Sequence, residues 1–113
     1  MAKVINTDKA PGAIGPYVQA QDLGNFLFAS GQVPINPQTG EVPEGVVAQT
    51  RQALANVKAI LEEAGLSVAT VVNAEYEKFF SDNKHPSFPA RSCVEVARLP
   101  KDVLIEVEVI AAR

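Results

Sequence analysis

The sequence predicts a single α+β domain in which a β-sheet packs against two helices. Short segments with period-two alternation come first, two segments with helical spacing follow, and two more alternating segments close the chain. The 113 residues are 47% hydrophobic, which suffices for one ordinary core and not for two. The predicted order of elements is therefore β-β-β-α-(β)-α-β-β over residues 1–113.

The N-terminal third of the chain predicts three strands. Lys3–Asn6 fits a short edge strand. Polar and apolar residues alternate over Tyr17–Leu23, and Phe26–Ser30 is apolar and aromatic. Asp22–Asn25 supplies the turn residues between them, so these two segments form a β-hairpin. Residues 31–40 contain two prolines and several turn dipeptides, and we expect a loop there.

Val46–Ala64 carries the clearest helical pattern. Its predicted apolar face consists of Val47, Leu54, Val57, Leu61 and Ala64. The polar residues Gln49, Arg51, Gln52, Asn56 and Glu63 are expected on the other faces. Gly65 follows directly and is a typical C-terminal stop.

The C-terminal half predicts one helix and up to three strands. Leu66–Val72 is rich in β-branched residues and fits the beginning of a strand, while Asn73–Phe80 has aromatic residues at helical spacing. After a proline-broken loop, Arg91–Arg98 and Val103–Ala111 alternate as strands. Pro100 lies in the turn that would join these two strands.

Both faces of the last predicted strand are informative. Val103, Ile105, Val107 and Val109 point one way, whereas Leu104, Glu106, Glu108 and Ile110 point the other way. Carboxylates mixed with apolar residues on the second face indicate a surface that is only partly wet. A subunit interface or a cleft would explain this pattern, and plain solvent exposure of the two glutamates is the alternative.

Composition excludes several classes of protein. The net charge is −3 and the isoelectric point is near 5.1. We therefore expect no broad basic surface for nucleic acid, although a local basic patch is left open. No apolar run approaches the roughly 20 residues of a membrane-spanning helix, and the first residues do not resemble a signal peptide. One cysteine cannot form an internal disulfide, which fits the cytoplasm.

The motifs of metal and nucleotide sites are missing from the sequence. His85 is the single histidine, and a surface loop residue is its simplest interpretation. The cysteine and histidine spacings of metal sites and the glycine-rich phosphate loops do not occur. We therefore expect neither a metal nor a nucleotide cofactor.

Arg91 and Cys93 are the remaining candidates for chemistry. Arg91 follows two prolines at the start of a predicted strand, and its guanidinium can grip a carboxylate with two hydrogen bonds. A ligand anchor and a surface ion pair both fit this position. Cys93 lies among apolar residues, where a small packing residue is the more common role than a nucleophile.

Four stretches carry a resemblance to a known family: AIGPYVQA (13–20), ASGQVPINPQTGEVP (29–43), RQALANVKAILEEAGL (51–66) and FPARSCVEVARLPKDV (88–103). The closing IEVEVIAAR (105–113) adds to them. Together they resemble the reactive intermediate deaminase A (RidA) family, also called YjgF-type proteins, over nearly the whole chain.

The resemblance implies a fold, an assembly and an activity. The fold is chorismate-mutase-like, with a mixed sheet and two helices packed on one face, and three such subunits form a homotrimer with clefts between neighbours. The family hydrolyses reactive enamines and imines, such as 2-aminoacrylate and 2-aminocrotonate, to 2-oxo acids and ammonia. Pyridoxal-phosphate dehydratases release these compounds, while the deaminase itself uses no cofactor and no metal.

The resemblance also assigns roles to residues of this sequence. Arg91 would hold the substrate carboxylate, and Glu106 would orient the attacking water or pass its proton. The cleft would be lined by Tyr17, Ser30, Gly31, Asn73, Ser92 and Cys93. At Cys93 the backbone, rather than the thiol, would contact the substrate nitrogen.

The chain departs from the family at one place. A strand and a loop of roughly 15 residues are absent near Val72–Asn73, the length of one strand with its connection. In the family this strand lies inside the sheet, between the last two strands. A real deletion and a segment lost from the recorded sequence both explain this, and loss is favoured because a missing internal strand leaves backbone groups unpaired. A vacancy one strand wide is then expected beside Val103–Ala111.

Other functions stay open at this point. The same cleft could serve a non-catalytic regulatory protein that binds 2-oxo acids, although a pure binder would not need Glu106. Some relatives are endoribonucleases or translation inhibitors, for which the acidic balance is unfavourable. A chaperone-like role has no diagnostic residue in this sequence.

Overall fold

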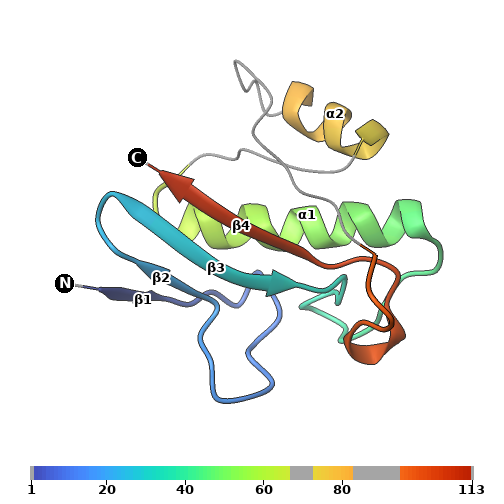
Figure 1. Cartoon of the computed structure of the whole chain (residues 1–113), viewed down its shortest axis with the longest axis horizontal. Helices are drawn as coiled ribbons and strands as arrows, with labels where there is room; N and C mark the ends of the chain where they lie inside the picture. The colour runs from blue at the N-terminus through green and yellow to red at the C-terminus, as the bar shows by residue number, and fades with distance from the viewer. Residues whose placement is uncertain (1, 67–72, 83–94, 113) are drawn as a thin grey trace.

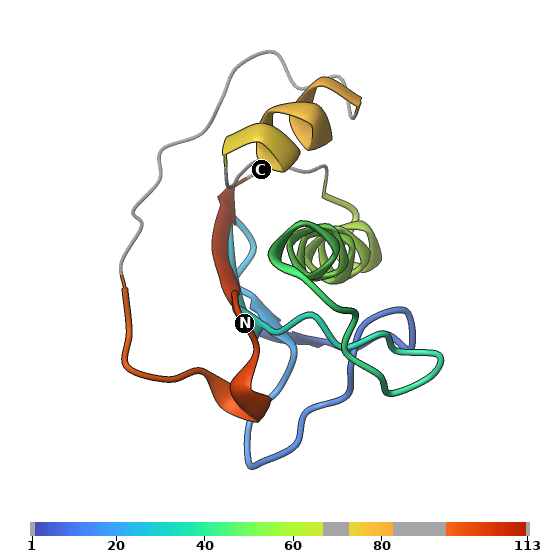
Figure 2. The same cartoon turned by 90° about the vertical axis from the view of Figure 1, so that its right-hand side faces the viewer.

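The structure of the chain is a computed structural model that describes residues 2–66, 73–82 and 95–112. Its elements are β1 (Lys3–Ile5), β2 (Ala20–Asp22), β3 (Phe26–Gln32), α1 (Val46–Glu63), α2 (Asn73–Asp82), the 3₁₀ turn η1 (Pro100–Asp102) and β4 (Val107–Ala112). The strands form one sheet in the order β1-β2-β3-β4 (Figure 1). Helix α1 lies across one face of this sheet, as Figure 2 shows, which gives the predicted α+β arrangement.

The predicted hairpin is present with shorter arms. β2 and β3 pair antiparallel, with Ala20 opposite Ala29 and Asp22 opposite Leu27. Gly24 adopts φ 94° in the connecting turn, a value that favours glycine. Its N–H donates to the Asp22 side chain at 2.9 Å, so the turn residues act as the sequence suggested.

Helix α1 supplies more of the core cluster than any other single element. Leu54, Ile60 and Leu61 are at most 1% exposed, and each such side chain contributes about 1.5–3 kcal/mol on burial. The helix ends as predicted at Gly65, whose φ is 75° and whose N–H donates to the Glu62 carbonyl. One part of the predicted apolar face is wrong, because Val47 is 49% exposed in the first turn, ahead of the stretch that crosses the sheet.

Two polar residues of α1 are buried, contrary to the prediction that they face outward. Gln49 and Asn56 are 7% and 0% exposed. The Asn56 amide donates to the carbonyls of Val33 and Ile35, both at 3.0 Å, and its oxygen accepts from Gln52. Asn56 is therefore buried because it satisfies backbone groups of the loop after β3, which apolar side chains could not do.

The second predicted helix is present and extends to Asp82. It packs beside α1, where Phe79 is half-buried against the core cluster. The strand predicted over Leu66–Val72 falls almost wholly outside the described residues. The structure therefore leaves that prediction untested.

The two C-terminal strands are shorter than predicted where the structure describes them. Of the predicted strand Arg91–Arg98, residues 91–94 lie outside the described part, and 95–98 are not strand. β4 begins at Val107 rather than Val103 and pairs antiparallel with β3. Burial favours the pairing of β4 with β3. Val107 and Val109 are 2% and 5% exposed, since this pairing places them in the core cluster with α1.

The described sheet also differs from the mixed sheet that the resemblance implied. All three strand pairings among residues 2–66 and 95–112 are antiparallel. The vacancy expected beside the last strand concerns the link at Val72, which lies outside the described residues, so this expectation stays a prediction. The alternation of the last segment is confirmed, since Val103, Val107 and Val109 are buried whereas Glu106 and Glu108 are exposed.

Candidate functional site

A β-bulge in β3 forms the centre of the candidate site. Ala29 pairs with Val109 and Gln32 pairs with Val107, so Ser30 and Gly31 together stand opposite the single residue Glu108. Such a bulge interrupts the ladder and redirects the backbone, and bulges are frequent beside active sites. The structure thus gives the two predicted residues of β3 a special backbone geometry.

Ser30 is held by the neighbouring strand region. Its N–H donates to the Gln19 carbonyl at 2.9 Å, and its hydroxyl donates to the Val18 carbonyl at 2.7 Å. The hydroxyl proton is therefore already engaged within the protein. In this arrangement Ser30 can offer a bound molecule an acceptor oxygen, but no free donor.

The structure brings Gly31 and Glu106 together. A Cβ atom built on Gly31 would fall 2.9 Å from the carboxyl carbon of Glu106 and 3.2 Å from its Cγ, with one carboxylate oxygen closer still. Gly31 is half-buried and Glu106 is exposed. The carboxylate therefore lies against the bulge backbone while it remains open to water.

Tyr17 reaches the same region through its chain neighbour. It directly precedes Val18, the residue whose carbonyl accepts from Ser30. Its ring folds over Gly15, its hydroxyl accepts from the Ile14 N–H at 3.3 Å, and the side chain is 48% exposed. Tyr17 thus belongs to a compact surface turn next to the bulge.

The other predicted site residues cannot be placed from the structure. Arg91, Ser92 and Cys93 lie outside the described residues. Asn73 is the first residue of α2, and the prediction for its side chain is likewise outside the described part. The site that the structure shows is therefore the half formed by Ser30, Gly31 and Glu106.

Sequence reasoning missed one residue that bears on this site. The buried Gln49 of α1 accepts a hydrogen bond from the Leu104 N–H at 2.7 Å. Leu104 lies between η1 and β4, outside the strand pairings that residues 2–66 and 95–112 form. A glutamine in a helix gives no sequence signal for such a contact, because the two residues are far apart in the chain.

An exposed ion pair lies at η1. Arg98 and Asp102 bond side by side across η1, one of the contacts measuring 2.9 Å. The Asp102 carboxylate raises the pKa of Arg98, against a small opposing effect of burial. The guanidinium is therefore a permanent cation. Lys101 and Asp102 both have positive φ, and the ion pair bridges this strained turn.

The sheet face away from α1 carries an exposed apolar row. The register places Val4 beside Gln21, Gln21 beside Phe28, and Phe28 beside Ile110. Val4, Phe28 and Ile110 are 52%, 47% and 61% exposed. Gln21 interrupts the row, and exposed apolar side chains gathered in this way with a polar neighbour are typical of a surface that meets another chain.

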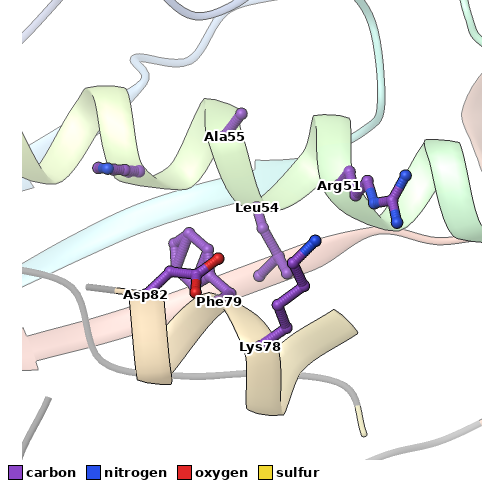
Figure 3. A pocket seen from close by; sticks show the side chains of 7 residues that line it. Arg51, Leu54, Ala55, Lys78, Phe79 and Asp82 are labelled. Carbon is purple, nitrogen blue, oxygen red and sulfur yellow. The ribbon is translucent and has the colours of Figure 1, made fainter. Parts of the chain in front are cut away.

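A separate hollow of about 280 Å³ lies between the two helices (Figure 3). Lys78 and Phe79 extend from α2 toward α1, and the buried Leu54 points from α1 toward them. Its lining is Arg51, Leu54, Ala55, Lys58, Lys78, Phe79 and Asp82. None of the predicted site residues is among them, so this hollow belongs to the helix–helix seam rather than to the candidate site.

Within residues 2–66, 73–82 and 95–112, no three His, Cys, Asp or Glu side chains gather as metal ligands. Over the same residues, no helix combines the length and the apolar character that a membrane crossing needs.

An antiparallel sheet covered by α1, with a glycine bulge under a carboxylate, defines a small α+β protein of the type that the sequence resembles. The family model described as "Endoribonuclease L-PSP" matches residues 7–76 and 72–113. The chain belongs to this family, the RidA/YjgF family.

Individual relatives match over their full length. A "RutC family protein" of Pasteurella multocida is 64% identical, covering 100% of this chain and 99% of the relative. The "2-iminobutanoate/2-iminopropanoate deaminase" of Escherichia coli K12 is 57% identical, again over 100% and 99%. Among solved structures, the E. coli YjgF gene product has 56% identity and a TM-score of 0.92, covering 98% of each chain. E. coli TdcF with bound serine has 50% identity and a TM-score of 0.93, also over 98% of each.

These alignments are longer than the chain itself. They extend over 128 residues, whereas this chain has 113. The family model matches in two segments, which overlap at residues 72–76.

Proposed function

We propose that the chain is a 2-iminobutanoate/2-iminopropanoate deaminase, which hydrolyses 2-imino acids and their enamine tautomers to 2-oxo acids and ammonia. The observation that carries the proposal is identity of 57% to a deaminase of that name, over essentially the whole of both proteins. The carboxylate of Glu106 above the Gly31 bulge supports it, because this hydrolysis needs a positioned group to handle a water proton.

The proposed chemistry divides between two ends of a small substrate. Arg91 binds the substrate carboxylate with two parallel hydrogen bonds. Glu106 holds the water that adds to the imine carbon and takes its proton. The nitrogen receives this proton and then the proton of the new hydroxyl group, the C–N bond breaks, and ammonia leaves as the C=O bond of the 2-oxo acid forms. Holding the reactants in a near-attack geometry supplies several kcal/mol of this rate enhancement.

The proposal includes a homotrimer. The apolar row Val4–Gln21–Phe28–Ile110 supports it, because single chains rarely leave such a row in water. A neighbouring subunit would complete the cleft that holds Arg91 and Glu106. Light scattering tests this assembly, and a stable, fully active monomer would contradict it.

The biological setting follows from the substrate. Pyridoxal-phosphate dehydratases release reactive imino acids of this kind, so these enzymes are the proposed metabolic partners. We predict a cytoplasmic protein that uses neither metal nor cofactor. A non-catalytic binder of 2-oxo acids is the main alternative, while the acidic net charge disfavours RNA cleavage.

One experiment separates these functions. The release of ammonia and 2-oxo acid is measured from freshly generated 2-aminoacrylate, with the unchanged chain and with Arg91→Ala. The deaminase proposal expects rapid release by the chain and almost none by Arg91→Ala, with both proteins folded by circular dichroism. Tight 2-oxo acid binding without any release would favour the regulatory binder.

The shorter length of the chain belongs to the same proposal. The alignments over 128 residues and the two-part family match support the absence of about one strand and loop near Val72. Whether this is a real deletion decides how complete the sheet is. Mass spectrometry of the protein from its natural source distinguishes the two cases, since a lost segment would add about 15 residues of mass.

A further inference from the structure

The bulge in β3 brings a residue without a side chain to the surface of the candidate site. Gly31 is not among the glycines with positive φ, so its backbone conformation does not by itself require glycine. Space requires it instead. The Glu106 side chain occupies the position that a Cβ atom of residue 31 would take. The Glu106 carboxylate thus occupies the space that glycine leaves free at position 31.

A second contact holds the backbone that leads to Glu106. Within the described part of the chain, the segment between η1 and β4 takes part in no strand pairing, and its amide groups still need acceptors. Gln49 provides one of them through its bond from the Leu104 N–H at 2.7 Å. Because Gln49 is 7% exposed and anchored in α1, it fixes this segment to the core two residues before Glu106.

We infer that Gly31 and Gln49 are positioning residues for Glu106. Gly31 sets where the carboxylate rests, and Gln49 sets where the backbone that carries it runs. Sheet and helix thereby define the location of one exposed, otherwise flexible side chain. The inference rests on the proposed function for the role of Glu106 in catalysis, but the positioning itself is measurable without any activity.

The first test is Gly31→Ala, with Gly12→Ala as its matched control. A Cβ at Gly12 meets nothing within 4 Å, and Gly12 also lacks positive φ. Gly31→Ala should stay folded, because the group it displaces is the far end of a flexible, exposed side chain. In its crystal structure the Glu106 carboxylate should have left the bulge. With 2-iminobutanoate generated in the assay, kcat should fall about tenfold or more while KM changes little.

The second test uses two substitutions at Gln49. Gln49→Leu removes the acceptor for the Leu104 N–H, whereas Gln49→Glu keeps an oxygen in its place. Hydrogen exchange of the Leu104 amide should be fast in Gln49→Leu and slow in Gln49→Glu. The value of kcat should follow the same order, with rescue by the conservative substitution. A purely structural role of Gln49 would lower thermal stability in both variants without this difference in kcat.

The outcomes separate the inference from the proposed function. If the unchanged chain shows no deamination, the proposed function fails, and the crystal structures and exchange rates still decide the positioning. If the chain is active and Glu106→Gln is not, normal kcat in Gly31→Ala would overturn the inference. A Glu106 carboxylate that stays in place in Gly31→Ala, or an unchanged Leu104 exchange rate in Gln49→Leu, would also overturn it.

Discussion

The side chain of Gln19 pairs with both backbone groups of Thr7. Its oxygen accepts from the Thr7 N–H at 2.7 Å and its nitrogen donates to the Thr7 carbonyl at 3.0 Å. The same nitrogen also contacts the carbonyls of Ala10 and Pro11. At 2% exposure, one glutamine thus replaces a strand partner for the loop between β1 and β2.

Gln19→Leu should lower the free energy of unfolding by about 2–4 kcal/mol, because it leaves several backbone groups without a partner at a buried position. Denaturant melts measure this change. The exposed Gln38→Leu is the control and should stay within about 0.5 kcal/mol of the unchanged chain. Equal effects at both positions would contradict the role assigned to Gln19.

Asn56→Asp should introduce a pH-dependent loss of stability. The introduced carboxyl would face the carbonyl oxygens of Val33 and Ile35 in a fully buried position, which raises its pKa above the unfolded value of about 3.9. The folded state then holds the proton more tightly, so stability relative to the unchanged chain is best at low pH and falls as pH rises above about 4. Thermal melts between pH 3.5 and 8 show this trend, which the exposed control Asn25→Asp should lack.

Leu61→Ala should cost about 2–5 kcal/mol, because its side chain is fully enclosed in the core and leaves a cavity. Val47→Ala lies on the same helix but is 49% exposed, and its effect should stay within about 0.5 kcal/mol. Paired denaturant melts compare the two. A large loss for Val47→Ala would restore the apolar face predicted from sequence.

Ser30→Ala should cost about 0.5–1.5 kcal/mol of stability, since it removes the hydrogen bond to the Val18 carbonyl. The hydroxyl proton of Ser30 is engaged inside the protein and is not offered to the substrate. The KM of Ser30→Ala for 2-iminobutanoate should therefore change by a smaller factor than kcat changes in Glu106→Gln. Melting curves and steady-state kinetics on one preparation give both quantities. A large rise in KM with unchanged stability would show a direct contact between Ser30 and substrate.

Glu106→Gln should lower turnover far more than binding, because it keeps the shape of the side chain and removes the base. We expect a loss of about 10²–10⁴ in kcat. Affinity for the product 2-oxobutanoate, measured by calorimetry, should be nearly unchanged. Lost affinity together with normal turnover of bound imine would contradict the role of Glu106.

Local chemistry made much of the fold predictable from sequence. Gly24 and Gly65 have positive φ and lie where a strand and a helix end. The alternation of Val107 and Val109 with glutamates indicated which side of β4 is buried. These signals act over a few residues. The pairing of β4 with β3 was not predictable in this way, because it depends on how the whole core closes over α1.

The site was predictable in part. Glu106 and Gly31 came from the resemblance, and the structure brings them into contact. Gln49 and Asn56 were placed on outer faces, because glutamine and asparagine in a helix are usually solvated. Only the path of distant backbone, at Leu104 and Val33, gives these amides their partners and their burial.

The pairing of β3 with β4 has a consequence for how the chain is made. β4 is the last described strand in chain order, yet it completes the centre of the core beside Leu27. During synthesis, β1 to β3 and α1 emerge well before the residues that cover them. A nascent chain must therefore hold this apolar surface incompletely covered from the end of α1 until β4 is made, and the long-range closure makes folding slow and exposed to aggregation at that stage. Ribosome-bound chains stalled before Val107 should accordingly bind holding chaperones that the released protein does not.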